Sequence, residues 1–192
     1  MRIITLLLLM PGLIACLAQP EPNISVDKEL FNSRHWNLAV LDLKYTALEQ
    51  AGQTGTVIFQ SAGADAGEVI ASLLAGELAN LSNINLVERG QIKNVLGEQK
   101  LQMTGVVDSS SAVEIGKILG ADAVLIGNVF DYLSWSSLAI PGSTVSYSMR
   151  IIDVETGKVL TSGSTSKVEN FTTAFQNAQN QTRTLVSKIT PQ

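Results

Sequence analysis

The stretch Ala123-Val-Leu-Ile-Gly-Asn-Val-Phe130 is nearly all apolar, and it decides the fold. An apolar run of this length is typical of a strand that is covered on both faces. A helical segment at about residues 111–119 precedes it and ends at Gly120, a residue type common just beyond helix ends. The pattern therefore predicts a helix that leads into the central strand of a sheet, with the strand continuing toward Trp135.

The segment after this strand is typical of a hairpin. Residues 145–153 form a second strand, the short turn Glu155-Thr-Gly-Lys158 follows, and a third strand reaches Val168. Ile140-Pro-Gly-Ser143 contains the residue types that favour turns, so we expect a turn there.

Helices are indicated by apolar residues that recur every three or four positions. One helix begins near Asp65 and reaches Leu81, and a second spans residues 88–100. The last helix begins near Phe171. Its predicted inward face consists of Phe171, Phe175, Ala178, Thr182, Leu185 and Ile189.

Residues 37–45 and 83–87 complete the pattern as strands, and residues 49–67 form a long loop with a short strand at 56–59. The predicted order is β-α-β-α-α-β-β-β-α. The fold class is α/β (α+β), a single domain in which a mixed sheet packs against about four helices.

The N-terminus has the pattern of a targeting segment. Arg2 is followed by a short apolar run that contains Pro11, which is typical of a signal peptide. Leu13-Ile14-Ala15-Cys16 resembles the bacterial lipobox, so we expect residues 1–15 to be removed and Cys16 to carry acyl chains. Residues 16–37 are then a lipidated tether and residues 38–192 the domain. Leu17, which is not Asp, favours sorting to the outer membrane.

Composition excludes most chemistry. The 192 residues include one Cys and one His, and the formal net charge is −4. Metal motifs lack ligands, and nucleic-acid binding lacks a basic excess. No phosphate-binding loop or serine nucleophile motif is present. Asp42, Asp153 and Glu155 fit structural roles better than catalysis. We expect no enzyme activity, catalytic residue, cofactor, metal or small-molecule substrate.

One aromatic group is a candidate contact surface. Tyr132, Trp135, Leu138 and Pro141 lie around the predicted turn near residue 140. Packing at the edge of the sheet is one interpretation, and contact with a partner, a second copy or a membrane is the other.

Several strings together resemble the CsgG family of curli assembly lipoproteins. They lie between about residues 38 and 167: Leu38-Ala-Val-Leu-Asp-Leu43, Leu86-Val-Glu-Arg89, Ile115-Gly-Lys-Ile-Leu-Gly-Ala-Asp-Ala-Val-Leu-Ile-Gly127 and Arg150-Ile-Ile-Asp-Val-Glu-Thr-Gly-Lys-Val-Leu160. The resemblance implies an outer-membrane lipoprotein with a periplasmic domain, which self-associates and serves the assembly or export of curli-like or other surface polymers.

The chain departs from the pore-forming pattern of that family. A barrel strand needs about 9–11 residues, and the connections in this chain are too short for two such hairpins. We therefore expect an assembly component without full barrel hairpins. The alternative is an LpoB-like activator that docks on a penicillin-binding protein in peptidoglycan synthesis, although the long Pro-rich stalk of such activators does not appear.

Overall fold

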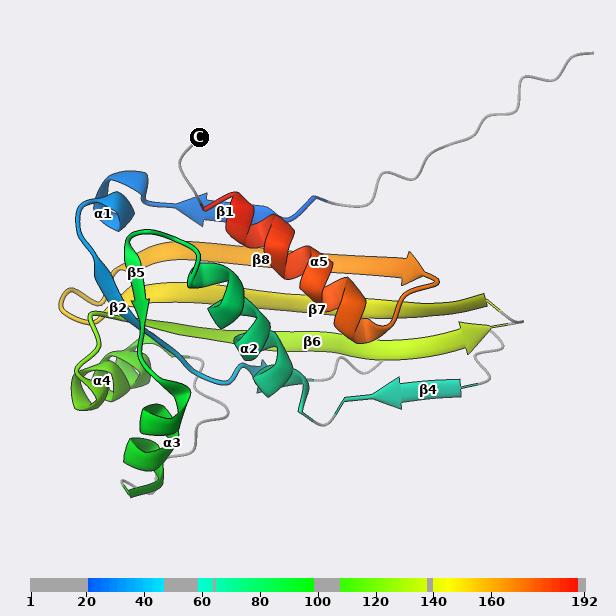
Figure 1. Ribbon diagram of the computed structural model, residues 1–192, viewed down its shortest axis with the longest axis horizontal. Helices are drawn as coiled ribbons and strands as arrows, with labels where there is room; N and C mark the ends of the chain where they lie inside the picture. The colour runs from blue at the N-terminus through cyan, green and yellow to red at the C-terminus, as the bar shows by residue number, and fades with distance from the viewer. Residues whose placement is uncertain (1–20, 47–58, 64, 99–107, 138–139, 190–192) are drawn as a thin grey trace, which may run out of the picture.

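The structure is a computed structural model, which describes residues 21–46, 59–63, 65–98, 108–137 and 140–189. Three long strands form the centre of the molecule. β6 (Ala123–Ser137) pairs antiparallel with β7 (Ile140–Asp153), and β7 pairs antiparallel with β8 (Val159–Asn170). These strands lie side by side along the long axis of the molecule (Figure 1). The apolar run at 123–130 is therefore a central strand, as predicted.

Shorter strands extend the sheet on both sides. β2 (Trp36–Val40) lies parallel to β6, and β5 (Ile84–Leu86) lies parallel to β2. β3 (Lys44–Tyr45) and β4 (Phe59–Ala62) also pair with β6, beyond β2. β1 (Asn23–Val26) pairs antiparallel with β8 at the opposite edge. The result is an eight-stranded mixed sheet with the order β1-β8-β7-β6-β2-β5, with β3 and β4 off this path.

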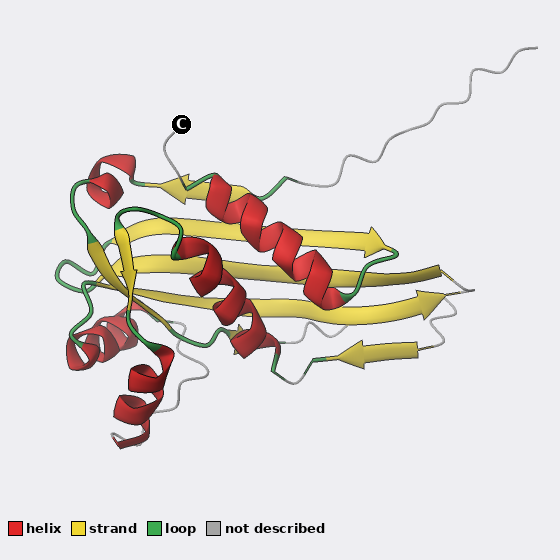
Figure 2. Cartoon of the chain, viewed as in Figure 1, coloured by secondary structure: helices red, strands yellow, loops and turns green. Residues whose placement is uncertain are grey.

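Helices cover the two faces of the sheet unequally (Figure 2). α2 (Ala66–Leu78) and α5 (Ala174–Ser187) pack on one face and build the larger apolar core with Leu125, Tyr147 and Ile151. α3 (Arg89–Glu98) and α4 (Ser109–Leu119) form a smaller core at one end of the other face. The far end of the β6–β7 hairpin extends beyond both cores.

The helix ends follow local sequence signals. Asp108 precedes α4, and its carboxylate accepts hydrogen bonds from the hydroxyl of Ser110 at 2.6 Å and the backbone N–H of Ser111 at 2.8 Å. These bonds lower the pKa of Asp108 to about 2, because they favour the ionised form. Gly120 ends the helix with a φ of 65°, as its residue type predicts.

β6 contains an irregularity that changes which residues share a face. Val129 pairs with Tyr147, whereas Asp131 pairs with Ser146, so one extra residue is inserted between them. Before this bulge, even-numbered residues such as Val124 face the core formed by α3 and α4. Beyond it, odd-numbered residues take the same face, because alternation along a strand has a period of two.

The predicted order of elements is confirmed, with additions at the N-terminal side. Residues 23–26 form β1, and residues 28–32 form helix α1 (Lys28–Asn32). Most of the segment expected to be a tether is therefore folded, because β1 pairs with β8 and Phe31 is buried. The strand expected at 37–45 is divided into β2 and β3.

Two further expectations are wrong. Ile140–Ser143 is not a turn, because β7 begins at Ile140, which pairs with Ser137, and only residues 138–139 separate the two strands. Phe171 and Phe175 do not face the core: Phe171 precedes α5 and is 74% exposed, and Phe175 is 50% exposed. Buried polar side chains take their place on the inner face of α5.

Candidate interaction surface

The free end of the β6–β7 hairpin holds the aromatic group predicted as a contact surface. Tyr132 is half-buried and packs against the larger core, and this burial raises its pKa. Trp135 is also half-buried, whereas Pro141 is exposed. Leu138 lies outside the described residues. The structure thus places Trp135 and Pro141 at the hairpin end and assigns Tyr132 mainly to the core.

The side chain of Trp135 lies against a glycine. It is paired with Gly142 across the hairpin. A Cβ at position 142 would lie only 2.5 Å from the indole atom Cζ2 of Trp135, closer than van der Waals contact allows. Gly142 therefore allows the indole ring to pack against the β7 backbone, on the sheet face opposite α5.

Four apolar side chains at this end of the molecule are exposed to solvent. Their exposed fractions are between 45% and 74%, and they are Ile140, Val168, Phe171 and Phe175. Ile140 begins β7, Val168 lies near the end of β8, and the two phenylalanines surround the start of α5. We call these four residues the apolar end. Exposed apolar groups gathered in one place are typical of contact surfaces.

Phe171 is held at this position by an unusual backbone conformation. Its φ is 61°, in the left-handed region that costs a side chain with a Cβ about 1–2 kcal/mol. Its N–H donates to the carbonyl oxygen of Pro141 at 2.7 Å, so the chain turns sharply from β8 toward α5. A strained backbone that supports an exposed phenylalanine is a combination that stability does not explain.

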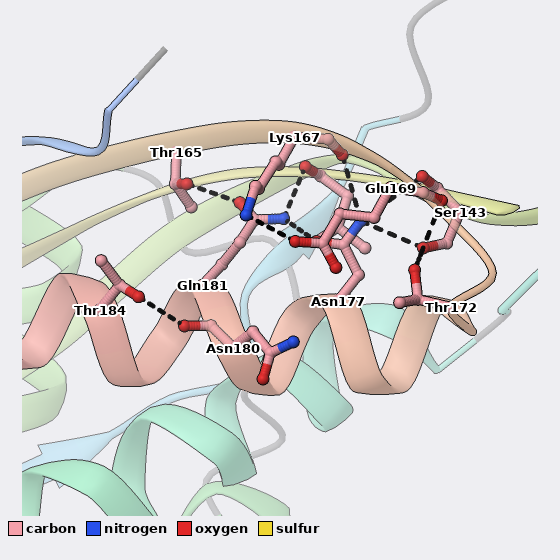
Figure 3. Close-up of polar contacts among 10 residues, drawn as sticks. Ser143, Thr165, Lys167, Glu169, Thr172, Asn177, Asn180, Gln181 and Thr184 are labelled. Atoms are coloured by element: carbon pink, nitrogen blue, oxygen red, sulfur yellow. Dashed lines mark hydrogen bonds and ion pairs between the residues drawn. The ribbon is translucent and has the colours of Figure 1, made fainter. Parts of the chain in front are cut away.

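A buried polar network fixes α5 on the sheet beside the apolar end (Figure 3). Asn177, which is fully buried, donates from Nδ2 to the Ser143 hydroxyl at 3.1 Å and to the Lys167 carbonyl at 3.2 Å. Its Oδ1 accepts from Nε2 of Gln181 at 2.6 Å. Gln181 in turn accepts from the Thr165 hydroxyl at 2.5 Å and donates to the Val145 carbonyl at 3.2 Å.

These bonds bind one face of α5 to β7 and β8. Thr182, which directly follows Gln181 in α5, adds a further contact, because its hydroxyl lies 2.9 Å from the hydroxyl of Tyr147. Burial raises the pKa of Tyr147 above its ordinary value. Since each partner must be placed within hydrogen-bonding distance, the network fixes the register of the helix on the sheet more closely than apolar contact would. It therefore fixes where Phe175 emerges.

A charged cluster of Asp42, Glu68, Arg89 and Lys93 lies just beyond the carboxyl end of β2. The buried carboxylate of Asp42 pairs with Arg89, which also lies 3.3 Å from Glu68. Lys93 lies 3.0 Å from Glu68, and its hydrogen bond and charge lower the pKa of Glu68. Asp42 thus joins α2 and α3 to the sheet, which is a structural role. Asp153 likewise accepts from the backbone N–H of Glu155 at 2.8 Å in the predicted turn.

The described residues show neither a metal site nor a membrane-spanning helix. Among them, no group of three His, Cys, Asp or Glu side chains is placed to hold a metal ion. None of the helices in the described ranges combines the length and apolar character needed to cross a membrane. In this arrangement, a buried polar network and a left-handed turn hold exposed apolar side chains at one end of the molecule.

Comparison with known proteins identifies the family. Residues 29–137 match the family model described as curli production assembly/transport component CsgG. The chain therefore belongs to the CsgG family, as the resemblance in its sequence predicts. No curated protein matches the chain.

Solved structures are similar to this chain at low sequence identity, and those with a TM-score above 0.5 share its fold. The PelC dodecamer from Paraburkholderia phytofirmans is 15% identical, with a TM-score of 0.53, and the match covers 88% of this chain and 92% of that one. Lipoprotein GNA1162 from Neisseria meningitidis is 19% identical, with a TM-score of 0.51 and coverages of 70% and 83%. LpoB from E. coli is 18% identical, with a TM-score of 0.49 and coverages of 88% and 83%.

The sequence did not indicate two members of the apolar end, Phe171 and Phe175. The available signal was the spacing of Asn177, Gln181 and Thr182, which recur at helical intervals on the same side as Ala178 and Leu185. A helix whose polar residues repeat in this way can bury them if the sheet beneath supplies partners. Ser143, Thr165 and Tyr147 are those partners.

Proposed function

We propose that this chain is a lipid-anchored, non-enzymatic assembly component of the bacterial outer membrane, with its domain in the periplasm. Membership of the CsgG family carries this proposal, since the family is described as an assembly and transport component. The lipobox that ends at Cys16 supports the anchor, and Leu17 supports the outer membrane as its location. Its work is then the assembly or export of a curli-like or other surface polymer.

Self-association is the second part of the proposal. The PelC chain that shares this fold is a dodecamer. This chain presents the apolar end together with Trp135 and Pro141, which would be shielded from water in a contact between copies. We propose this end as the contact surface, with Tyr132 beneath it in the core, and we include Leu138 in the proposal from the sequence alone.

The reach of the anchor favours this role over activation of a penicillin-binding protein. Because β1 begins at Asn23, only seven residue steps separate it from Cys16. They span at most about 25 Å when fully extended. A domain held this close to its membrane suits assembly at the membrane surface, whereas reaching a partner through peptidoglycan requires a longer stalk.

Fractionation tests the anchor. The full-length protein is expected in the outer-membrane fraction, Cys16→Ala in the soluble periplasm, and Leu17→Asp in the inner membrane of an enteric-type host. Cys16→Ala protein that still sediments with outer membranes would contradict lipid anchoring at this residue.

Light scattering on the detergent-extracted, lipidated protein tests self-association. A double variant at the apolar end, Ile140→Ser with Phe171→Ser, is expected to reduce the oligomer. The matched control is Ile118→Ser with Val159→Ser, which removes two similarly exposed apolar residues away from the hairpin end. A wild-type protein that remains monomeric at all concentrations would overturn this part. Specific recovery of a penicillin-binding protein with such a monomer would support the activator alternative.

A further inference from the structure

The sheet face opposite α5 contains a pocket where β7, β8 and β1 lie side by side. Its volume is about 270 Å³. Among the described residues, the apolar core beneath α3 and α4 includes residues of β2, β6 and β7 but none of β8 or β1, so these helices do not cover it. We call it the polar pocket, and the side chains that line it are those of Asn23, Ser25, Ser148, Arg150, Ser162 and Ser164.

Pairing between the strands arranges these six side chains in two rows. One row consists of Ser148, Ser164 and Asn23, and the other consists of Arg150, Ser162 and Ser25. Both rows point away from α5, because Met149 and Ile24, which alternate with them, pack in the larger core. The rows are about 7 Å apart along the strands, and each extends about 10 Å across them. The polar pocket therefore offers polar groups on several sides of one small ligand.

The chemistry of the lining favours an anion. Each serine hydroxyl and the amide of Asn23 can donate a hydrogen bond, and the guanidinium of Arg150 adds a positive charge. None of the six lining side chains is a carboxylate, which would repel an anion. Arg150 already takes part in another interaction within the chain. Its five N–H donors are more than one partner uses, so donors remain for a ligand.

The charges that flank the polar pocket on the same face nearly balance. Lys44 pairs with Asn128, and Asn128 pairs with Ser148, so Lys44 extends the first row at its far end. Asp131 pairs with Ser146, in the neighbouring row toward the hairpin end. Neither charged side chain lines the polar pocket. The guanidinium within it therefore decides the local charge.

We propose that the polar pocket binds a phosphate ester, with Arg150 as its charge partner and Ser148, Ser162 and Ser164 as hydroxyl donors. A phosphate group carries oxygen atoms on several sides and so fits donors that come from neighbouring strands, whereas a carboxylate has two oxygens in one plane. The planar fork of an arginine also suits phosphate oxygens. The inference does not depend on self-association.

Two sources could supply this group: the headgroup of a phospholipid or a phosphorylated solute. Asn23 lines the polar pocket and is seven residue steps from Cys16, at most about 25 Å when extended. The lipid source rests on the proposed anchor, which would hold the pocket within that distance of the headgroups. The solute source is independent of the anchor.

Isothermal titration calorimetry of the detergent-extracted, lipidated protein with inorganic phosphate, at constant ionic strength, tests the site. We expect saturable binding at one site, and Arg150→Gln should weaken it by about tenfold or more, because a charge-assisted hydrogen bond is lost. Lys158→Gln is the matched control. It removes the same charge from an exposed lysine outside the polar pocket, so binding should not change.

A pair of serine variants tests the site without a change of charge. Ser164→Ala removes a lining hydroxyl and should weaken phosphate binding by about threefold or more. Ser166→Ala removes an exposed hydroxyl on the same face of β8, outside the polar pocket, and should bind phosphate normally. Circular dichroism checks that all variants fold.

Native mass spectrometry distinguishes the two sources. The lipidated protein is released from mixed micelles of detergent and phosphatidylglycerol. Retention of this lipid by the wild type and by Lys158→Gln, with its loss in Arg150→Gln, assigns the site to a headgroup. Phosphate binding without lipid retention that depends on Arg150 assigns it to a phosphorylated solute.

Three results would overturn the inference. They are no saturable binding up to about 10 mM phosphate, equal weakening by Arg150→Gln and Lys158→Gln, and binding of acetate as tight as that of phosphate. The second would mean that only the overall charge matters, and the third that the site does not select phosphate. None of them bears on the anchor, which the fractionation of Cys16→Ala tests separately.

Discussion

Replacing Asn177 by alanine tests whether the polar network fixes α5 on the sheet. The substitution removes hydrogen bonds to the carbonyls of Ser143 and Lys167, to the Ser143 hydroxyl and from Gln181. The Ser143 hydroxyl keeps Thr172 as a partner, and Nε2 of Gln181 keeps Val145. The expected loss of stability therefore comes mainly from the hydrogen bonds to the carbonyls of Ser143 and Lys167.

Each net hydrogen bond contributes about 0.5–1.5 kcal/mol, and the small cavity adds about 1 kcal/mol or less. We expect Asn177→Ala to lower the free energy of unfolding by about 2–3 kcal/mol. Asn180→Ala is the matched control. Asn180 lies one turn away on the exposed side of α5, and its backbone carbonyl accepts a hydrogen bond from the Thr184 hydroxyl (Figure 3). Its expected change is within about 0.5 kcal/mol.

Urea unfolding followed by circular dichroism measures both variants, with the midpoint shift converted at a constant slope. Equal shifts for Asn177→Ala and Asn180→Ala would refute the argument, because the buried network would then contribute nothing specific. In that case α5 would be held mainly by its buried apolar residues, which are Ala174, Ala178, Leu185 and Val186.

Three further outcomes follow from the structure. Gly67→Ala is expected to destabilise the domain by about 2 kcal/mol or more in the same urea assay, because its Cβ would lie 1.9 Å from the backbone oxygen of Leu43. Gly76→Ala in the same helix has open space and should stabilise by about 0.5–1 kcal/mol, so a loss at both positions would contradict the reasoning. Phe171→Gly should raise stability by about 0.5 kcal/mol, since it relieves the left-handed backbone and removes little burial; a clear loss would show that Phe171 packs within the monomer. Because the pKa of Asp108 is lowered from 3.8 to about 2 in the folded state, its carboxylate stabilises the fold at pH values above 3.8. This stabilisation is lost as the pH falls toward about 2, and Asp108→Asn should abolish this part of the acid sensitivity in pH-dependent unfolding.

The central sheet could be predicted because its strands have strong local signals. The apolar run at 123–130 and the turn at 155–158 each report their own structure without reference to distant residues. β1 has no such signal, since it is a four-residue strand in polar surroundings that forms through pairing with β8. The short strand predicted at 56–59 overlaps β4 only at Phe59, and its other residues lie outside the described part of the chain. Only the folded sheet makes residues 23–26 a strand.

The end of the molecule that carries the candidate surface was predicted in part. Trp135 and Pro141 were expected there because aromatic and turn residues gather near residue 140. The exposure of Phe171 and Phe175 was missed, because hydrophobic periodicity assumes that apolar residues face inward. Here Asn177 lies on the inner face of α5. Its partners are distant in the sequence: Ser143 lies 34 positions earlier and Lys167 ten positions earlier.

The bulge between Val129 and Asp131 bears on how this hairpin can change in length. Beyond it, Leu133 and Trp135 share the face opposite α5, together with Thr144 and Val168 across the sheet. An insertion of two residues in each strand would lengthen the hairpin and leave this arrangement intact, whereas an insertion of one would exchange the two faces. The hairpin can therefore gain or lose residues only in multiples of two per strand without exchanging its faces. The bulge is the one place where β6 already contains a single extra residue.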